Sequence, residues 1–264
     1  MGLTDILVHL DHLTSCGARL EVAISLARQH QARLTGLLVV RHRYPTEAAV
    51  AAAQSCFEQR VAAAGIKGRW QCVDGSSAGA GMTEVLLSRT PSSDLLVIGQ
   101  GSGEAADVGV PFDLPERLVL EAGLPVLIVP YAGTFATVGE RVLVAWKAGR
   151  ESTRALNDAL PILQRAHRVE IMAKKDADTY GGMQGGQLAE LFAHLAKRGV
   201  VARPCSLLTR KATLGDALLN RVCDEGFDLL VLGAYAHGEE GSRAFGSVAR
   251  QLLKQMTVPV LMSH

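Results

Sequence analysis

A group of small residues near the end of the chain has the composition of an anion-binding site. An apolar segment ends at Gly233, and after a polar loop a helical pattern begins at Gly246, Ser247 and Val248. The first amides of a helix have no partners within the helix, and they lie at the positive end of its dipole. Ser247 is suited to the N-cap position, and Arg250, three residues later, brings no carboxylate to these amides. We therefore predict a site that is open to a phosphate or another anion.

The segments that must position this site occur twice in the chain. The second half repeats the first-half segments DLLVIG and LPVLIV as DLLVLG and VPVLMS, and both pairs are offset by 134 positions. The beginnings also agree, since the second half has RVLVAWKAGRESTRALNDALPIL where the first has DILVHLDHLTSCGARLEVAISLA. Each copy has the size of an ordinary domain, so we predict an internal duplication. The matching segments are 94–99 with 228–233, 124–129 with 258–263, and 5–27 with 141–163.

Within each copy, short apolar runs alternate with segments of helical periodicity. A continuous apolar run bounded by Gly or Pro is typical of a strand that is buried on both faces of a parallel sheet. We predict strands at 5–11, 33–40, 67–73, 95–98 and 125–129, and in the second copy at 141–146, 169–173, 201–207, 229–232 and 258–261. We predict helices at 14–30, 46–64, 81–89 and 114–122, and in the second copy at 151–165, 187–198, 214–225 and from 247 onward.

This alternation predicts an α/β fold made of two tandem doubly wound domains. Right-handed crossovers between successive strands produce a five-stranded parallel sheet with helices on both faces. We place the first domain at residues 1–131 and the second at 140–264. The segment YAGTFATVG, at residues 131–139, is the predicted linker.

Composition narrows the classes of function. A chain of 264 residues that is 48% hydrophobic can bury one core in each copy. A net charge of +1 gives no electrostatic footprint for nucleic acid or for an anionic membrane surface. No apolar run approaches the ~20 residues that span a bilayer, and the start lacks the features of a secretory signal. Five scattered cysteines without a C-x-x-C pair are typical of reduced thiols, so we expect a cytoplasmic protein.

The duplicated pattern resembles the universal stress protein family in its tandem form. The resemblance rests on a first strand followed by an acidic residue, a late strand followed by a glycine loop, G-S-V at a helix start, and a last P-V-L strand, and it covers nearly the whole chain. It implies an adenine nucleotide alpha hydrolase-like fold. In the nucleotide-binding branch the late loop reads G-x2-G-x9-G-[ST]. There the loop and the helix start hold the phosphates, and the acidic residue contacts the nucleoside.

The second copy keeps part of that nucleotide pattern. Gly233 matches the first glycine, Ala236 stands where the second is expected, and Gly246 and Ser247 match the end. An alanine with φ > 0 is strained by about 1 kcal/mol or more, so Ala236 departs from a position suited to glycine. Lys147 stands where the first copy has an acidic residue, and lysine accepts no hydrogen bond from a ribose hydroxyl, although it can meet an anion.

The first copy departs from the pattern in the opposite way. Asp11 and Gly99 are present, but Phe112 and Asp113 replace the Gly-Ser pair. Asp113 and Glu116 have the spacing of a capping box, which would bring two carboxylates to the helix start, while Phe112 would crowd the approach. We predict that the first copy does not bind ATP.

Each candidate residue has a structural alternative. Asp11 contacts a nucleoside or caps the turn after its strand, and Ser247 contacts a phosphate or is a plain N-cap. His237 touches a phosphate or is an exposed loop histidine, and Lys147 is an anion ligand or an ordinary surface lysine. His9, Asp11, His12 and Cys16 are ligand types close together, but they lack a tetrahedral spacing signature, so no metal site is predicted. No G-x-S-x-G elbow is present, and no catalytic residue is assigned.

From these observations we expect a stress-response regulator or protective protein that acts by binding. Its ligand would be ATP or another small anion in the second domain, with Mg²⁺ only in company with ATP. A first alternative is a ligand-free scaffold that acts through protein partners, and a second is a slow ATP hydrolase. The resemblance implies that residues 125–129 and 258–262 pair the two copies as a pseudo-dimer within the chain. An exposed sheet edge would also allow a homodimer of chains.

Overall fold

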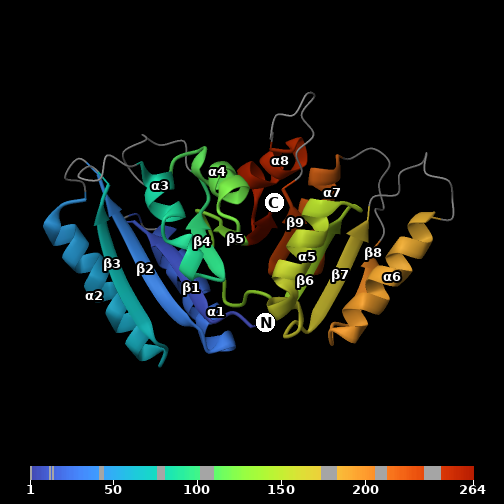
Figure 1. The fold of residues 1–264 in the computed structure, drawn as a ribbon, viewed down its shortest axis with the longest axis horizontal. Helices are drawn as coiled ribbons and strands as arrows, with labels where there is room; N and C mark the ends of the chain where they lie inside the picture. The colour runs from blue at the N-terminus through green and yellow to red at the C-terminus, as the bar shows by residue number, and fades with distance from the viewer. Residues whose placement is uncertain are drawn as a thin grey trace. The chain divides into compact units, whose positions relative to one another are not determined.

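The computed structural model describes residues 2–11, 13, 15–41, 45–75, 81–101, 110–173, 183–205, 213–234 and 245–264. The chain divides into two compact units, residues 1–138 (unit 1) and residues 139–264 (unit 2). Figure 1 shows strands with helices packed along them in each unit. No helix in the described part of the chain is long and apolar enough to cross a membrane.

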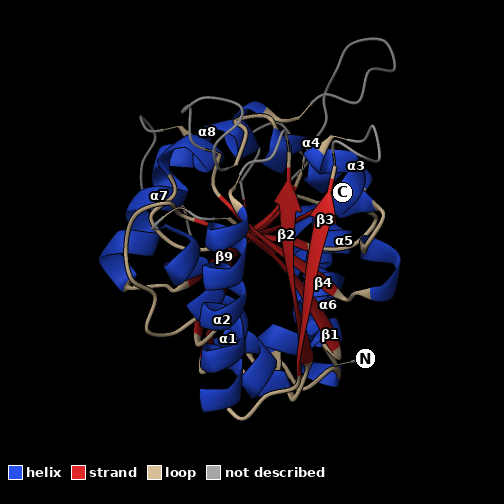
Figure 2. Ribbon diagram, turned by 90° about the vertical axis from the view of Figure 1, so that its left-hand side faces the viewer, coloured by secondary structure: helices blue, strands red, loops and turns tan. Residues whose placement is uncertain are grey.

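Unit 1 is a five-stranded parallel sheet with the strand order β3-β2-β1-β4-β5. In Figure 2, α1 and α2 lie on one side of β2 and β3, and α3 and α4 lie on the other. The order arises because the chain moves outward from β1 to β3 and then returns to the other side of β1. The elements are β1 (Asp5–Leu10), α1 (Ser15–His30), β2 (Arg33–Val40), α2 (Glu47–Ala63), β3 (Gly68–Asp74), α3 (Met82–Leu87), the 3₁₀ turn η1 (Thr90–Ser92), β4 (Leu95–Gly99), α4 (Leu114–Glu121) and β5 (Val126–Val129).

Unit 2 repeats this topology with the strand order β8-β7-β6-β9-β10, again entirely parallel. The central strand β6 lies between β7 and β9, as β1 lies between β2 and β4 in unit 1. The elements are β6 (Arg141–Trp146), α5 (Arg150–Leu163), β7 (Arg168–Ala173), α6 (Met183–Lys197), β8 (Ala202–Cys205), α7 (Leu214–Glu225), β9 (Leu229–Gly233), α8 (Ser247–Gln255) and β10 (Val260–Ser263).

The predicted α/β class and the parallel sheets are confirmed, and the differences lie at the ends of elements. Every residue of β4 and of β9 is buried, as their continuous apolar runs predict. The last strand of unit 2 begins at Val260, two residues later than the predicted 258. The strand predicted at 201–207 is described over Ala202–Cys205, and positions 206 and 207 lie outside the described residues. Helix boundaries differ by a few residues, since the ends of helices depend on local capping as well as on periodicity.

The repeated aspartate before each late strand joins that strand to the start of its unit. Asp94 accepts hydrogen bonds from the amide of Thr4 at 2.7 Å, from the Thr4 hydroxyl at 2.7 Å and from the amide of Asp5 at 3.0 Å. Asp228 accepts three backbone amides, those of Gly139 and Glu140 at 3.1 Å each and that of Arg141 at 2.9 Å. The aspartate of the repeated DLLV segment therefore fixes the chain that enters the central strand.

We predict that Asp228→Ala lowers the free energy of unfolding by about 2 kcal/mol, because three backbone amides lose a charged acceptor. Asp228→Asn keeps one acceptor oxygen and should lose less. Urea denaturation measures both. Asp158→Ala is the control, since Asp158 forms a surface ion pair with Arg154 and should change stability by only about 0.5 kcal/mol. Equal losses for Asp228→Ala and Asp158→Ala would contradict this role.

Candidate functional site

The topology makes the carboxyl end of the central strand the expected ligand position in each unit. Ligands of doubly wound sheets bind where successive crossovers leave in opposite directions, which is between β1 and β4 in unit 1 and between β6 and β9 in unit 2. At this point unit 1 has Asp11 after β1 and Gly99 at the end of β4. Unit 2 has Lys147 after β6 and Gly233 at the end of β9. The topology thus brings Lys147 and Gly233, two residues of the predicted site, to the ends of neighbouring strands.

In unit 1 this point carries a buried ion pair. The guanidinium of Arg19, on α1, donates to the Asp11 carboxylate at 2.7 Å, and the side chains are 2% and 6% exposed. Arg19 also donates to the carbonyl of His9 at 2.8 Å and lies 3.1 Å from His9 Nδ1. The second Asp11 oxygen accepts the amide of Leu13 at 2.9 Å. Asp11 thus makes the turn contact that the sequence left as its structural alternative, and in addition it neutralises a buried arginine.

The environment of this pair holds Asp11 and Arg19 charged and His9 neutral. Burial alone would raise the pKa of the Asp11 carboxyl, but the charges of Arg19 and His9 and the hydrogen bonds from Arg19 and Leu13 lower it below its ordinary value. Burial, with a smaller contribution from the charge of Arg19, lowers the pKa of His9 to about 4. Burial favours the neutral form of Arg19, yet Asp11 and Cys16 raise its pKa.

Gly99 lets the arginine lie directly against the end of β4. A Cβ atom at Gly99 would lie 3.0 Å from Cζ and from Nη2 of Arg19, closer than most side-chain contacts. The guanidinium therefore lies between the ends of β1 and β4, where a ligand of this fold would lie. In unit 1 the crevice contains an internal cation and its counter-charge.

Unit 2 has the same backbone arrangement without the buried cation. The amide of Lys147 lies 3.3 Å from the Ser152 hydroxyl, as the amide of Asp11 lies 3.4 Å from the Cys16 thiol. In the aligned segments Ala155, which is buried, takes the position of Arg19, and Ala145 takes that of His9.

The end of β9 is close to backbone rather than to a charged side chain. A Cβ atom at Gly233 would lie 2.6 Å from the backbone nitrogen of Ser152 at the start of α5. Only glycine lets the first turn of α5 approach the strand end this closely. Small residues stand in place of Arg19 and His9, and Lys147, which is exposed, follows β6 at the same strand end.

The start of α8 differs in one detail from the sequence prediction. Gly246 is the N-cap, in an extended conformation, and Ser247 is the first helical residue, so the prediction of Ser247 as N-cap was wrong. Gly246 makes no side-chain cap hydrogen bond, and the first turn contains no acidic residue. Ser247 is exposed, and Val248 is half-buried. Gly246 itself therefore brings no side chain to the amides of the first turn, and binding of an anion there stays a prediction.

The predicted capping box in unit 1 was wrong. Asp113 is the N-cap of α4, but its side chain makes no cap hydrogen bond. Its φ of −85° and ψ of −13° are helical, whereas a capping side chain usually requires an extended backbone. The ring of Phe112 is 57% exposed, and it is the backbone of Phe112 that lies against Gly101, after β4. Unit 1 therefore differs from the nucleotide pattern mainly at the strand ends, where Arg19 lies. The start of α4 contributes less to this difference than the sequence predicts.

Two candidate site residues, Ala236 and His237, lie outside the described residues, and so does His12. Among the residues that the structure does describe, no group of three or more ligand-type side chains could hold a metal ion.

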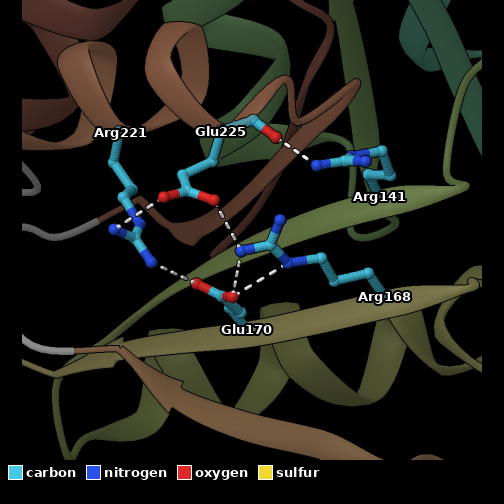
Figure 3. Close-up of polar contacts among 5 residues, drawn as sticks. All are labelled: Arg141, Arg168, Glu170, Arg221 and Glu225. Atoms are coloured by element: carbon cyan, nitrogen blue, oxygen red, sulfur yellow. Dashed lines mark hydrogen bonds and ion pairs between the residues drawn. The ribbon is translucent and has the colours of Figure 1, made fainter.

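A second charged cluster lies in unit 2 at the opposite ends of the strands (Figure 3). Glu170, on β7, is 6% exposed and accepts hydrogen bonds from Arg168 at 2.9 Å and from Arg221, on α7, at 3.0 Å. Arg168 also donates to the Glu225 carboxylate at 2.9 Å, and Arg141 donates to the Glu225 carbonyl. Burial opposes ionisation of Glu170, but its hydrogen bonds with the two arginines hold its pKa below the ordinary value. Because Arg141 and Arg168 begin their strands, this network attaches α7 to the sheet away from the crevice.

Sequence reasoning missed Arg19. The inward stripe of α1 contains Cys16, Leu20 and Ala23, and Arg19 lies three residues after Cys16 and four before Ala23, on the same face. That spacing, together with Asp11 and His9 on the preceding strand, was a usable signal for a buried ion pair.

Comparison with known proteins agrees with the two-unit structure. The family model described as "Universal stress protein family" matches residues 139–264, which are unit 2. A universal stress protein from Archaeoglobus fulgidus is 16% identical, with a TM-score of 0.71 over 98% of this chain and 97% of that chain. A functionally unknown protein from Pseudomonas aeruginosa is 15% identical, with a TM-score of 0.69 over 99% and 92%. These likenesses show that both units together have the fold of the two matched structures.

A universal stress protein solved in complex with cAMP resembles half of the chain. It is 20% identical, covers 50% of this chain and 100% of that chain, and has a TM-score of 0.40. No curated protein matches the chain.

We predict that stability falls between pH 6.5 and pH 4 because of His9. The unfolded chain protonates this histidine below about pH 6.5, whereas the folded protein does so only near pH 4, so the unfolded state binds more protons in this window. The expected loss is up to about 3 kcal/mol in urea denaturation. His9→Asn, whose carbonyl oxygen can accept from Arg19, should lose less over the same window. His194→Asn, at an exposed histidine, is the control and should follow wild type; a His9→Asn variant that also follows wild type would contradict the prediction.

Proposed function

Because unit 2 is a universal stress protein domain, we propose that the protein acts in a stress response by binding a small anionic ligand in unit 2. Mg²⁺-ATP is the first ligand to test. The observation that supports this proposal best is the start of α8, where the N-cap is a glycine without a cap hydrogen bond and the first turn is free of acidic residues. Such a helix start offers backbone amides and a positive dipole to a phosphate.

The residues at the end of β6 and in α5 also favour an anion. Lys147 follows β6 at the carboxyl edge of the sheet, where the fold binds its ligands. Ala145 and Ala155 replace the His9 and Arg19 of unit 1, so the arginine and the histidine that surround Asp11 in unit 1 have no counterpart at these two positions. In this proposal Gly233, Gly246, Ser247 and Val248 approach the phosphates, and Lys147 supplies a compensating charge. Asp11 has no part in it, because its carboxylate is paired with Arg19.

We propose binding rather than catalysis, and the alternative of slow hydrolysis would depend on Glu239 or Glu240, which lie outside the described residues. Hydrolysis of a phosphoanhydride needs a group that positions or deprotonates water, together with stabilisation of the leaving charge. No described residue at the end of β9 or at the start of α8 is a carboxylate. The simplest mode of action for such a site is that ligand binding changes the contacts of this protein with another protein.

The test is isothermal titration of Mg²⁺-ATP into wild type and Ser247→Asp. The substitution places a carboxylate in the first turn of α8, where it competes for the amides and repels phosphate. We expect about one site per chain in wild type and at least about a tenfold loss of affinity in the variant.

The matched control is Ser55→Asp, which makes the same change of charge at an exposed position on α2 and should bind as wild type does. Equal affinity in Ser247→Asp and wild type would exclude the α8 site. No binding in wild type at millimolar Mg²⁺-ATP would overturn ATP as the ligand and would leave the scaffold alternative.

A further inference from the structure

The sheet of unit 1 ends in a strand that is paired on one side. β3 (Gly68–Asp74) pairs with β2 along its whole length, and none of the other strands in the described part of the chain pairs with it. Figure 2 looks toward this end of the sheet, where β2 and β3 are seen with α1 and α2 on one side. Arg69, Cys72 and Asp74 are exposed. An exposed edge of this kind offers backbone N–H and C=O groups to another strand.

The hydrogen bonds to β2 show which residues of β3 direct their backbone groups outward. The amide of Leu34 donates to the Lys67 carbonyl at 2.8 Å, and the amide of Gly75 donates to the Val40 carbonyl at 2.9 Å. In a parallel ladder the backbone groups of successive residues point alternately to the two sides of the strand, so the odd-numbered positions from 67 to 75 face β2. The residues that face outward are Gly68, Trp70, Cys72 and Asp74.

The corresponding edge of unit 2 is shorter and contains a proline. β8 (Ala202–Cys205) pairs with β7 as β3 pairs with β2, and it has four residues with Pro204 among them. Proline carries no N–H group, and short edge strands and edge prolines both oppose pairing with another chain. β3 has seven residues and no proline. Of the two matching edges, the edge of unit 1 is therefore the one suited to pairing.

The length of β3 selects one register for pairing with a second copy of itself. In an antiparallel pair about a twofold axis, the numbers of two facing residues have a constant sum. With Gln71 on the axis, Gly68 of one copy lies opposite Asp74 of the other. Trp70 then lies opposite Cys72, so every outward-facing residue meets another. Moving the axis by one residue in either direction leaves an outward-facing residue beyond the end of the facing strand.

The charges of β3 also favour the antiparallel arrangement. Lys67 and Arg69 carry positive charge at the start of the strand, Asp74 carries negative charge at its end, and all three are exposed. In the register with Gln71 on the axis, Asp74 of one copy lies opposite Gly68 of the other, between the two basic positions. Each basic strand start then lies beside an acidic strand end, whereas a parallel pair would bring like charges together. This complementarity points to a second copy of the chain as the partner.

We propose that two copies of this chain associate through β3 in antiparallel orientation, with Gln71 of each copy on the twofold axis and the sheet of unit 1 continuous from one copy to the other. The proposal names the edge and the register of the homodimer that an exposed edge allows. It does not depend on ligand binding in unit 2, so the association is measured without nucleotide.

Sedimentation equilibrium of the full chain measures the association, and a proline at position 72 tests the edge. Cys72→Pro removes an outward N–H from each copy and leaves the hydrogen bonds to β2 in place. The dimer Kd should rise at least about tenfold, because two carbonyl groups lose their donors across the interface. Cys72→Ser keeps the N–H and is the matched control, which should associate as wild type does. Wild type at monomer mass up to about 0.5 mM, or equal Kd values for the two variants, would overturn the proposal.

A disulfide between two introduced thiols tests the register, and it decides the proposal even if Cys72→Pro does not fold. Gln71→Cys, made together with Cys72→Ser, places the two thiols at a non-hydrogen-bonded pair, where the Cα atoms lie about 4.5 Å apart and within reach of a disulfide. Val73→Cys with Cys72→Ser is the control, because the two copies of position 73 are about 13 Å apart along the strands. Mild oxidation with a pyridyl disulfide, read by peptide mass spectrometry, should link the first pair at least about tenfold faster. Equal rates would contradict the register.

Reversing the charge at the strand start tests the choice of partner. Arg69→Glu puts a carboxylate beside Asp74 of the other copy at both ends of the interface, so the dimer Kd should rise about tenfold at low salt. Arg89→Glu makes the same change of charge at an exposed position outside β3 and should associate as wild type does. If Arg69→Glu and Arg89→Glu have the same Kd, the antiparallel pairing of β3 is wrong.

Discussion

The buried ion pair between Arg19 and Asp11 determines how the two halves of this duplicated chain differ. A guanidinium that is only 2% exposed is stable there because a carboxylate lies 2.7 Å away and the His9 carbonyl lies 2.8 Å away. The pair lies at the carboxyl end of the central strand, which is where this fold binds ligands. Unit 1 has this pair at the strand ends, whereas unit 2 has an alanine at the position that matches Arg19.

The same pair gives the matching strand ends of the two units different charged groups. In unit 2 the exposed Lys147 and the start of α8, whose first turn contains no acidic residue, provide positive potential, which suits an anion. In unit 1 Arg19 already neutralises Asp11 at the matching strand end.

The fold was largely predictable because its signals are local and occur twice. Continuous apolar runs identified β4 and β9, and the constant offset between repeats gave the two-unit organisation.

The details of the sites were harder to predict. An arginine within a helix is ordinarily a surface residue, and its burial depends on His9 and Asp11, which only the fold brings to it. Asp113 is a residue type that commonly caps helices, but its backbone is helical and its side chain makes no cap hydrogen bond. At α8 the N-cap is Gly246 rather than Ser247 because the backbone of Gly246 is extended, which the sequence does not show.

The difference between the two crevices can be measured residue by residue with backbone amide NMR during addition of Mg²⁺-ATP. If unit 2 holds the anion and unit 1 is closed by its own ion pair, the amides of Ser247, Val248 and Ala249 will shift, and those of Asp11, Leu13 and Gly99 will stay in place. Shifts concentrated at Asp11 and Gly99, with the start of α8 unchanged, would contradict this assignment and would place the ligand in unit 1.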